Sequence, residues 1–438
     1  MRRMLSLGMA TFALVALATA SNAGPTLLFD AKSGQVMDSE NPFARWYPAS
    51  LTKLMTTYVA FRAVEAGEVT LQSPVRVSRN AANEAPSKMG YPVGTVLSLD
   101  DAIKIIMVKS ANDIATSIGE SLAGSEEAWA ARMNAESKRL GMTGSHWVNA
   151  HGLHDDDQYT TARDLAILAS TLRRDYPQYA SYFSIEGLSF GKQVIPSHNK
   201  LIGRFEGADG MKTGYTCPAG YNLVASATRD GRTLMAIVIG ATSVKARNET
   251  AAGLLAKGFS QPTAGGLTLA AMTPSGAGID QPTNMREALC TKAGSQALRK
   301  KEREIAAQRK KEGNPEPASY LTKRDGPREL IPISIGTATG PAPAAIAALL
   351  AQDAAEKAAQ AAEEAKKQAA IAAGFDPAIP LPSWRPDRPT PEGTEPAIGD
   401  AEFGEIEAAV EDAEATAPDA ETETETAAPD PAVVTLDK

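Results

Sequence analysis

The chain has 438 residues, of which 43% are hydrophobic and 22% are charged, and its formal net charge is −8. Much of the negative charge lies near the C-terminus, because no Lys or Arg occurs between Arg388 and Lys438 while Asp and Glu recur throughout. This balance argues against nucleic acid as a partner. The length is sufficient for a domain with a substantial hydrophobic core.

The first residues are typical of an export signal. Arg2 and Arg3 supply positive charge, residues 4–20 are mostly apolar, and residues 21–23 form a small-residue cleavage site. We therefore expect a mature periplasmic protein that begins near Gly24. An uncleaved anchor is the alternative, although the apolar run is short for a permanent span. No later segment is apolar enough to cross a bilayer.

Residues 24–265 have the pattern of one α+β domain. A hairpin is expected at its start, from Thr26–Asp30 and Gln35–Asp38 with Gly34 in the turn. Helices follow, and Ser or Thr residues suited to cap them precede several apolar runs. The expected helices lie at residues 49–65, from Ser98, from Ser110, from Ser125 and from Thr161.

The end of this domain returns to strands. They are expected at Tyr221–Thr228 and Thr233–Ala241, followed by a helix at Val244–Lys257. Strands at both ends with helices between them predict an antiparallel sheet, closed by both ends of the domain, beside a helical lobe.

The composition changes after residue 265. Residues 266–340 show little regular pattern apart from a basic helix near 296–311 and a short strand at 330–335, and residues 341–375 form an Ala-rich helix. We interpret that helix as a solvated spacer, with a coiled-coil partner as the alternative. Residues 376–438 are Pro-rich and then acidic, which predicts disorder.

Two cysteines, Cys217 and Cys290, occur in the chain. An oxidising compartment permits a disulfide between them, and two free thiols are the alternative. A bond would tie the segment after the domain to the loop that follows Lys212-Thr213-Gly214.

Three short motifs occur in an order and at a spacing that are informative about function. They are Ser50-Leu51-Thr52-Lys53, Ser110-Ala111-Asn112 and Lys212-Thr213-Gly214. Ser110 follows Ser50 by 60 positions, and Lys212 follows Ser110 by 102. Each motif alone is common by chance. In this order and at this spacing they resemble the active site of the penicillin-recognising serine enzymes, and thus imply a β-lactamase/transpeptidase-like domain.

The first motif has the chemistry of an activated nucleophile. Ser50 and Lys53 lie one helical turn apart, so the amine can accept the hydroxyl proton. Lysine acts as a base only if burial and a nearby positive charge lower its pKa, and Lys212 is a candidate for that charge. The N–H of Ser50 is suited to an oxyanion, and the resemblance implies the N–H of Tyr215 as a second donor.

The other two motifs have chemistry suited to a peptide substrate. Ser110 can relay a proton to a leaving nitrogen, and the Asn112 amide can hold a substrate amide. Lys212 and Thr213 suit a carboxylate, while Gly214 allows close approach of the backbone. No metal ion or other cofactor is expected.

The flanking sequences narrow the resemblance to the low-molecular-mass D-alanyl-D-alanine carboxypeptidases over about residues 24–260. The segments that carry it are residues 46–56, 151–153, 159–164, 198–200 and 209–216. The resemblance implies that Ser50 attacks the penultimate D-alanine of a peptidoglycan stem pentapeptide, that the terminal D-alanine leaves and that water releases the acyl-enzyme. It also implies that β-lactams acylate Ser50.

Three other functions are considered. A class A β-lactamase requires a Glu-x-x-Leu-Asn loop, whose glutamate activates the deacylating water, and this pentapeptide is absent between Ser110 and Lys212. A D-alanyl endopeptidase would use the same serine, and a non-catalytic peptidoglycan-binding scaffold would not need it. A catalytic role for His151 is disfavoured, since the motifs already supply a base.

Two further features of the resemblance concern substrate and membrane. Relatives use a basic residue upstream of Lys-Thr-Gly, for which His198, Lys200 and Arg204 are all candidates. Relatives often end in a basic amphipathic helix on the membrane, whereas this terminus is acidic. We therefore expect no C-terminal membrane anchor.

Overall fold

A computed structural model describes residues 24–262, 266–314, 318–324 and 326–372. The expected export signal and the expected disordered tail lie outside these residues. The helices are η1 (Ala49–Leu51), α1 (Thr52–Glu65), α2 (Arg79–Asn83), α3 (Leu99–Val108), α4 (Asn112–Ala123), α5 (Glu126–Leu140), α6 (Ala162–Asp175), η2 (Pro177–Phe183), α7 (Val244–Phe259), η3 (Leu269–Ala271), α8 (Arg286–Cys290), α9 (Lys292–Lys311) and α10 (Ala347–Ala372). The strands are β1 (Thr26–Asp30), β2 (Val36–Glu40), β3 (Pro74–Arg76), β4 (Val96–Ser98), β5 (Gly187–Phe190), β6 (Gln193–Pro196), β7 (Ala208–Thr216), β8 (Gly220–Arg229), β9 (Arg232–Ala241) and β10 (Leu330–Pro332).

The central sheet has five strands in the order β2-β1-β9-β8-β7. All four pairings are antiparallel, and β1 pairs with β9, so the first and last strands of the domain lie side by side. This arrangement confirms the predicted sheet. Strand β7, which contains Lys212-Thr213-Gly214, lies at the edge, where its free side is available to a cleft or a ligand.

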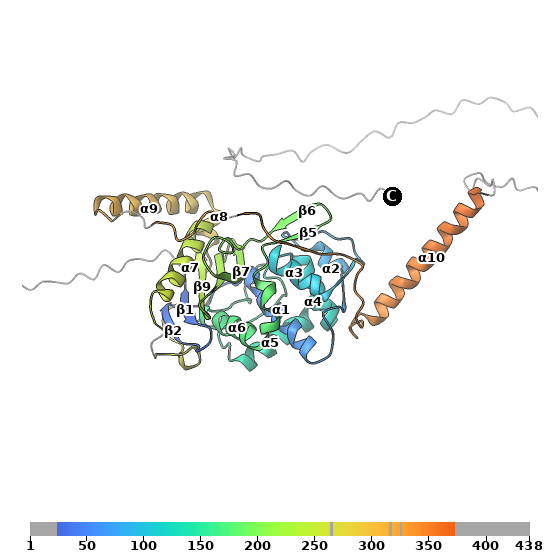
Figure 1. Cartoon of the computed structure of the whole chain (residues 1–438), viewed down its shortest axis with the longest axis horizontal. Coiled ribbons are helices and arrows are strands. Elements are labelled where there is room, and N and C mark those ends of the chain that lie inside the picture. Colours follow the sequence, from blue (N-terminus) through green and yellow to red (C-terminus); the bar gives the residue numbers. More distant parts are fainter. Residues whose placement is uncertain (1–23, 263–265, 315–317, 325, 373–438) are drawn as a thin grey trace, which may run out of the picture. The chain divides into compact units, whose positions relative to one another are not determined.

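Side chains alternate across the sheet because successive residues of a strand point to opposite faces. Along β9, Leu234, Ala236 and Val238 pack toward α7, while Met235 and Ile237 join the larger core. The sheet therefore lies between α7 on one face and the helical lobe on the other (Figure 1).

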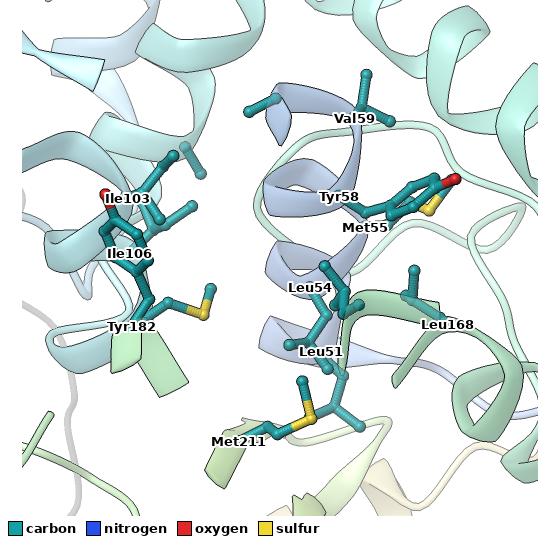
Figure 2. Close-up of a cluster of buried hydrophobic side chains, with 14 of the residues drawn as sticks. Leu51, Leu54, Met55, Tyr58, Val59, Ile103, Ile106, Leu168, Tyr182 and Met211 are labelled. Carbon is teal, nitrogen blue, oxygen red and sulfur yellow. The ribbon is translucent and has the colours of Figure 1, made fainter. Parts of the chain in front are cut away.

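Helix α1 passes through the middle of the larger core. Its side chains are buried on nearly every side, with Leu54, Met55 and Tyr58 inaccessible to solvent. Figure 2 shows Ile103 on one side of α1 and Leu168 on the other. A helix that is apolar all round belongs inside a domain, so the side chain of Lys53 is buried with it.

Three helix caps occur where the sequence predicts them. The side chains of Ser98, Ser125 and Thr161 each accept a hydrogen bond from the backbone N–H three residues later. The prediction that Ser110 begins a helix is wrong by two residues. Helix α4 begins at Asn112, and Ser110 has a φ of 63° in the turn between α3 and α4.

Part of the chain beyond residue 318 packs against the domain as a strap, which we define as residues 318–346 without the undescribed residue 325. Its strand β10 pairs in parallel with β5, and the side chains of Ile333 and Ile346 are buried. The backbone N–H of Gly340 also donates to Gln72 O at 2.8 Å. The sequence predicts a short strand here but not its partner, because pairing depends on residues more than a hundred positions away.

The basic helix begins somewhat earlier than expected, at Lys292, and no residue of it is buried. Within the described part of the chain, no helix is both long enough and apolar enough to cross a membrane. The division of the chain into segments stays a prediction.

Candidate active site

A pocket lies where β7, η1, the turn before α4 and the start of α7 meet. Residues from all three sequence motifs reach it. Its lining consists of Ser50, Pro86, Ser87, Ser110, Asn112, Gly152, Leu153, His198, Lys200, Thr213, Gly214, Tyr215, Thr216, Tyr221, Val244 and Arg247.

Ser50 is held at the start of a helix by an unusual local backbone. The preceding residue, Ala49, has a φ of 47°, a conformation that costs a non-glycine residue roughly 1–3 kcal/mol. Gly152 approaches so closely that an added Cβ would lie 1.9 Å from Ala49 O. The buried Asn222 donates to the backbone oxygens of Tyr47 and Pro48, at 3.0 and 3.2 Å. These contacts attach the serine to the sheet.

The Lys53 amine is buried and has three polar neighbours. Its Nζ lies 2.7 Å from Asn112 Oδ1, 2.6 Å from His151 O and 3.2 Å from Ser50 Oγ. Burial and then the positive charge of Lys212 hold the pKa of Lys53 well below its usual range. A neutral amine has two N–H donors and one lone pair, so donation to Asn112 and His151 leaves the lone pair for the Ser50 proton.

Lys212 forms a second buried pair, with Ser110. Its Nζ lies 2.9 Å from Ser110 Oγ and 3.0 Å from Thr213 O. Burial and the nearby Arg247 lower the pKa of Lys212 to about 7. Ser110 is therefore hydrogen-bonded to Lys212, whereas Ser50 is hydrogen-bonded to Lys53.

Gly214 brings the edge strand against the start of the Ser50 helix. A Cβ on Gly214 would lie 3.1 Å from both Ser50 N and Pro48 O, so any larger residue would push β7 away. From the sequence we expect Gly214 to let the strand approach the substrate closely. In the structure, the atoms nearest to the position of its missing Cβ belong to the backbone around Ser50. Tyr215 follows on the pocket wall, and its ring stacks on Tyr221 at 4.3 Å between centroids.

Asn112 connects the pocket to the loop before residue 91. Its Oδ1 accepts from Lys53, its Nδ2 donates to Ala85 O at 2.8 Å, and its backbone N donates to Ser87 O at 2.7 Å. One N–H of the amide has no partner among these contacts.

Sequence reasoning missed Arg247, which lies in the first turn of α7. The guanidinium is buried, and this burial lowers its pKa to about 10. It shares the pocket wall with two of the three upstream candidates, His198 and Lys200, while Arg204 lies outside this lining. The helix was predicted, but nothing in its sequence indicates that this residue faces the cleft.

The ring of His151 does not line the pocket. Its Nδ1 accepts from Leu153 N at 3.0 Å, and its Nε2 lies 3.3 Å from carboxylate oxygens of both Glu84 and Glu126. These three side chains are close enough to surround a metal ion. Because Nδ1 accepts a hydrogen bond, the neutral ring has its proton on Nε2, which the two carboxylates satisfy without a metal. His151 contributes its backbone oxygen to Lys53 instead.

The two cysteines form a disulfide beside the pocket. The Cα atoms of Cys217 and Cys290 are 5.9 Å apart, which resolves the alternatives left open by the sequence. The bond attaches α8 to the β7–β8 turn, and the hydroxyl of Tyr215 lies 3.4 Å from Cys290 Sγ. The turn that follows the Lys-Thr-Gly strand β7 is thereby attached to α8, which lies in the segment after residue 265.

Comparison with known proteins identifies the family of this chain. The sequence profile of the family described as D-alanyl-D-alanine carboxypeptidase matches residues 13–243. The chain belongs to this family. The carboxypeptidase DacC of Escherichia coli is 36% identical over 53% of this chain and 60% of its own length. The chain thus spans about three fifths of that curated relative.

Solved structures of the family have the same fold. Penicillin binding protein 5 of Haemophilus influenzae is 34% identical, with a TM-score of 0.52 over 55% of this chain and 71% of that one. A penicillin-binding protein of Listeria monocytogenes, solved in a cefotaxime-bound form, is 28% identical, with a TM-score of 0.50 over 54% of this chain and 97% of that one. The α+β, transpeptidase-like fold is therefore established for the N-terminal part of the chain.

Proposed function

We propose that this protein is a serine-type D-alanyl-D-alanine carboxypeptidase that removes the terminal D-alanine from peptidoglycan stem pentapeptides. One observation supports this function above the rest: the buried Lys53 amine lies 3.2 Å from Ser50 Oγ and has two other acceptors for its N–H groups. A buried amine in this setting is a base for the hydroxyl.

In the proposed acylation, Ser50 Oγ attacks the carbonyl carbon of the penultimate D-alanine. The hydroxyl proton passes to Lys53 Nζ, and the carbonyl oxygen becomes an oxyanion that the N–H groups of Ser50 and Tyr215 stabilise. Removal of one such donor typically costs about 3–4 kcal/mol. The C–N bond then breaks, and Ser110, which is hydrogen-bonded to Lys212, passes to the leaving nitrogen the proton that Lys53 had accepted, so that Lys53 is again a neutral amine.

Deacylation completes the cycle. D-Alanine departs, and water attacks the ester carbonyl after giving a proton to the same base. The ester bond to Ser50 Oγ breaks, and the oxygen regains its proton. Lys53 is a suitable base for both half-reactions because its low pKa returns it to the neutral amine.

The positive end of the pocket suits the free carboxylate of the substrate. Thr213 and Arg247 line this end of the pocket. Lys212 lies behind them, near enough for the charge of Arg247 to lower its pKa. The guanidinium of Arg247 donates to Asn248 Oδ1 at 3.0 Å and forms no salt bridge among the described residues. A planar guanidinium pairs well with a carboxylate. Recognition of a terminal carboxylate favours removal of the last residue over cleavage inside a chain. Asn112 is proposed to hold the amide of the acyl side.

The compartment and the inhibitors follow from the same proposal. Peptidoglycan lies outside the cytoplasm, and the first 23 residues resemble an export signal, so we propose a periplasmic enzyme of cell-wall metabolism. A β-lactam has a strained amide and a carboxylate, which match the nucleophile and the basic end of the pocket. We expect such compounds to acylate Ser50.

The experiment that tests this function compares purified mature protein with the variant Ser50→Ala. Pentapeptide monomers, cross-linked dimers and a fluorescent penicillin are supplied separately. Release of D-alanine from monomers and labelling of Ser50, both absent in Ser50→Ala, are the expected results.

Other outcomes would favour the alternatives. Cleavage of dimers without release of D-alanine from monomers indicates the endopeptidase. Rapid turnover of the penicillin indicates a β-lactamase. A folded protein with neither label nor hydrolysis would leave a binding scaffold as the better interpretation.

A further inference from the structure

A second, smaller hollow adjoins the active-site pocket. Lys200 lines both of them. The hollow is rich in basic side chains, and its lining consists of Glu186, Ser197, Asn199, Lys200, Ile202, Arg204, Arg324 and Arg328. We call this set the basic hollow.

Positive charge in the basic hollow is only partly neutralised. Arg324 pairs with Glu186 at 2.9 Å, and Arg204 donates to Thr322 O at 3.0 Å. Among the described residues, neither Lys200 nor Arg328 forms a salt bridge, although Arg328 is near enough to Glu186 for its charge to lower the pKa of that carboxyl. Partial burial, followed by the charges of Arg328 and Arg204, lowers the pKa of Lys200. Clustered cations of this kind favour an anion from solution.

The strap supplies half of these cations. Arg324 and Arg328 lie beyond residues 13–243, the part of the chain that matches the family profile. The strap is fixed here by Thr322 N, which donates to Arg204 O at 2.8 Å, and by Arg324, which donates to Ile202 O at 2.7 Å. The basic hollow is thus built jointly by the domain and its C-terminal extension.

The position of Lys200 relates the basic hollow to the leaving side of the substrate. Lys200 shares the pocket wall with Thr213 and Arg247, the residues proposed to receive the carboxylate of the departing D-alanine. Thr213 and Arg247 are sufficient to bind a leaving group that has a single carboxylate. A leaving group with a second carboxylate would extend past them toward Lys200 and Arg328.

We propose that the basic hollow is an anion-binding subsite for a second carboxylate on the leaving side of the scissile bond. The inference rests on the proposed function. It predicts that the enzyme accepts, beyond D-alanine, a terminal residue with an additional carboxylate as the leaving group. Specificity would arise from charge, so an uncharged group of equal size would not gain the same affinity.

Two acyl-peptides that differ in one functional group test this proposal with the mature full-length protein. One ends in D-Ala-D-Glu and the other in D-Ala-D-Gln, and D-Ala-D-Ala serves as the reference. We expect kcat/KM to be roughly threefold to fivefold higher for the D-Glu peptide, as one solvent-accessible ion pair provides. The difference should lie mainly in KM and should shrink as the salt concentration rises.

The variant Arg328→Gln should reduce this preference toward equality and leave D-Ala-D-Ala hydrolysis within about twofold, since an exposed charge contributes little elsewhere. Arg299→Gln, the same change on the exposed helix α9, is the matched control and should keep the preference. Equal rates for the two peptides in the unmodified protein, or an unchanged preference in Arg328→Gln, would overturn the proposal.

Binding measurements separate this result from failure of the proposed function. In Ser50→Ala, which lacks the nucleophile, calorimetry should still detect tighter binding of the D-Glu peptide than of the D-Gln peptide. If the unmodified protein hydrolyses D-Ala-D-Ala but Ser50→Ala binds both peptides equally, the subsite is refuted alone. If no peptide is hydrolysed while the binding difference persists, the carboxypeptidase proposal fails and the subsite stands.

Discussion

Two lysine amines beside this pocket are buried, each with its own hydrogen bonds. Lys53 and Lys212 both have pKa values below those of lysines in water, mainly because burial disfavours the charged form. The unfolded chain therefore binds more protons than the folded one between pH 7 and the ordinary lysine pKa, so folding stability increases with pH in that window. Burial of these amines therefore lowers folding stability at neutral pH, and it favours a neutral amine beside Ser50, as the proposed mechanism requires.

The lowered pKa values of the two amines predict a bell-shaped pH dependence for kcat/KM. The rate should rise with pH as Lys53 loses its proton, and fall as Lys212, with a pKa of about 7, loses the charge that attracts the carboxylate. In Lys212→Arg the charge persists at high pH, so the alkaline fall should move upward by more than about one pH unit even if the overall rate is lower. Stopped-flow acylation by a chromogenic β-lactam measures this. An alkaline limb that stays in place would show that another group causes it.

At the scale of elements, the edge strand β7 is positioned from both ends. Gly214 brings it against the backbone of Ser50, and the Cys217–Cys290 disulfide fixes the turn that follows it. An edge strand has neighbours on one side only, so such attachments limit its motion. Both attachments involve residues beside the proposed oxyanion donors.

Removal of the disulfide is expected to destabilise the protein without abolishing the fold. The bond joins residues 73 positions apart, and a loop of this length typically contributes about 2–4 kcal/mol. The double variant Cys217→Ser with Cys290→Ser should unfold at lower urea concentration, and acylation of Ser50 should slow as the β7–β8 turn becomes looser. The unmodified protein under reducing conditions is the control, and its urea midpoint and acylation rate should match those of the double variant. Equal midpoints with and without the bond would contradict this prediction.

At the scale of the whole molecule, the strap packs into the domain that bears the pocket rather than forming a unit of its own. Ile333 is 5% exposed within the larger core cluster, while Ile335, two residues later, is 43% exposed. Strand β10 extends the β5–β6 pair to three strands. Chain beyond the family match therefore contributes to the core of the part that matches.

This arrangement predicts a long-range effect on stability. Ile333→Ala should lower the free energy of unfolding by about 2–3 kcal/mol, because it removes buried methyl groups and leaves a cavity. Ile335→Ala, the matched control on the same strap, should change it by less than about 0.5 kcal/mol. Urea unfolding followed by fluorescence should show one transition for domain and strap together. A separate early transition, or equal effects of the two variants, would mean that the strap is not part of the cooperative unit.

The sequence alone determined several of the elements and the order of the three motifs. Caps at Ser98, Ser125 and Thr161, the opening hairpin and the final strands follow from patterns within a few residues. The Ser50–Lys53 pair was predictable for the same reason, since one helical turn fixes their separation.

Only the tertiary structure decided what surrounds these motifs. It placed Arg247 on the pocket wall, formed the disulfide and brought the arginines of the strap beside Lys200. The physical reason is that burial and charge at a point in space depend on residues far apart in the chain. Local periodicity specifies which face of a helix is apolar, but not which charged group the fold brings against it.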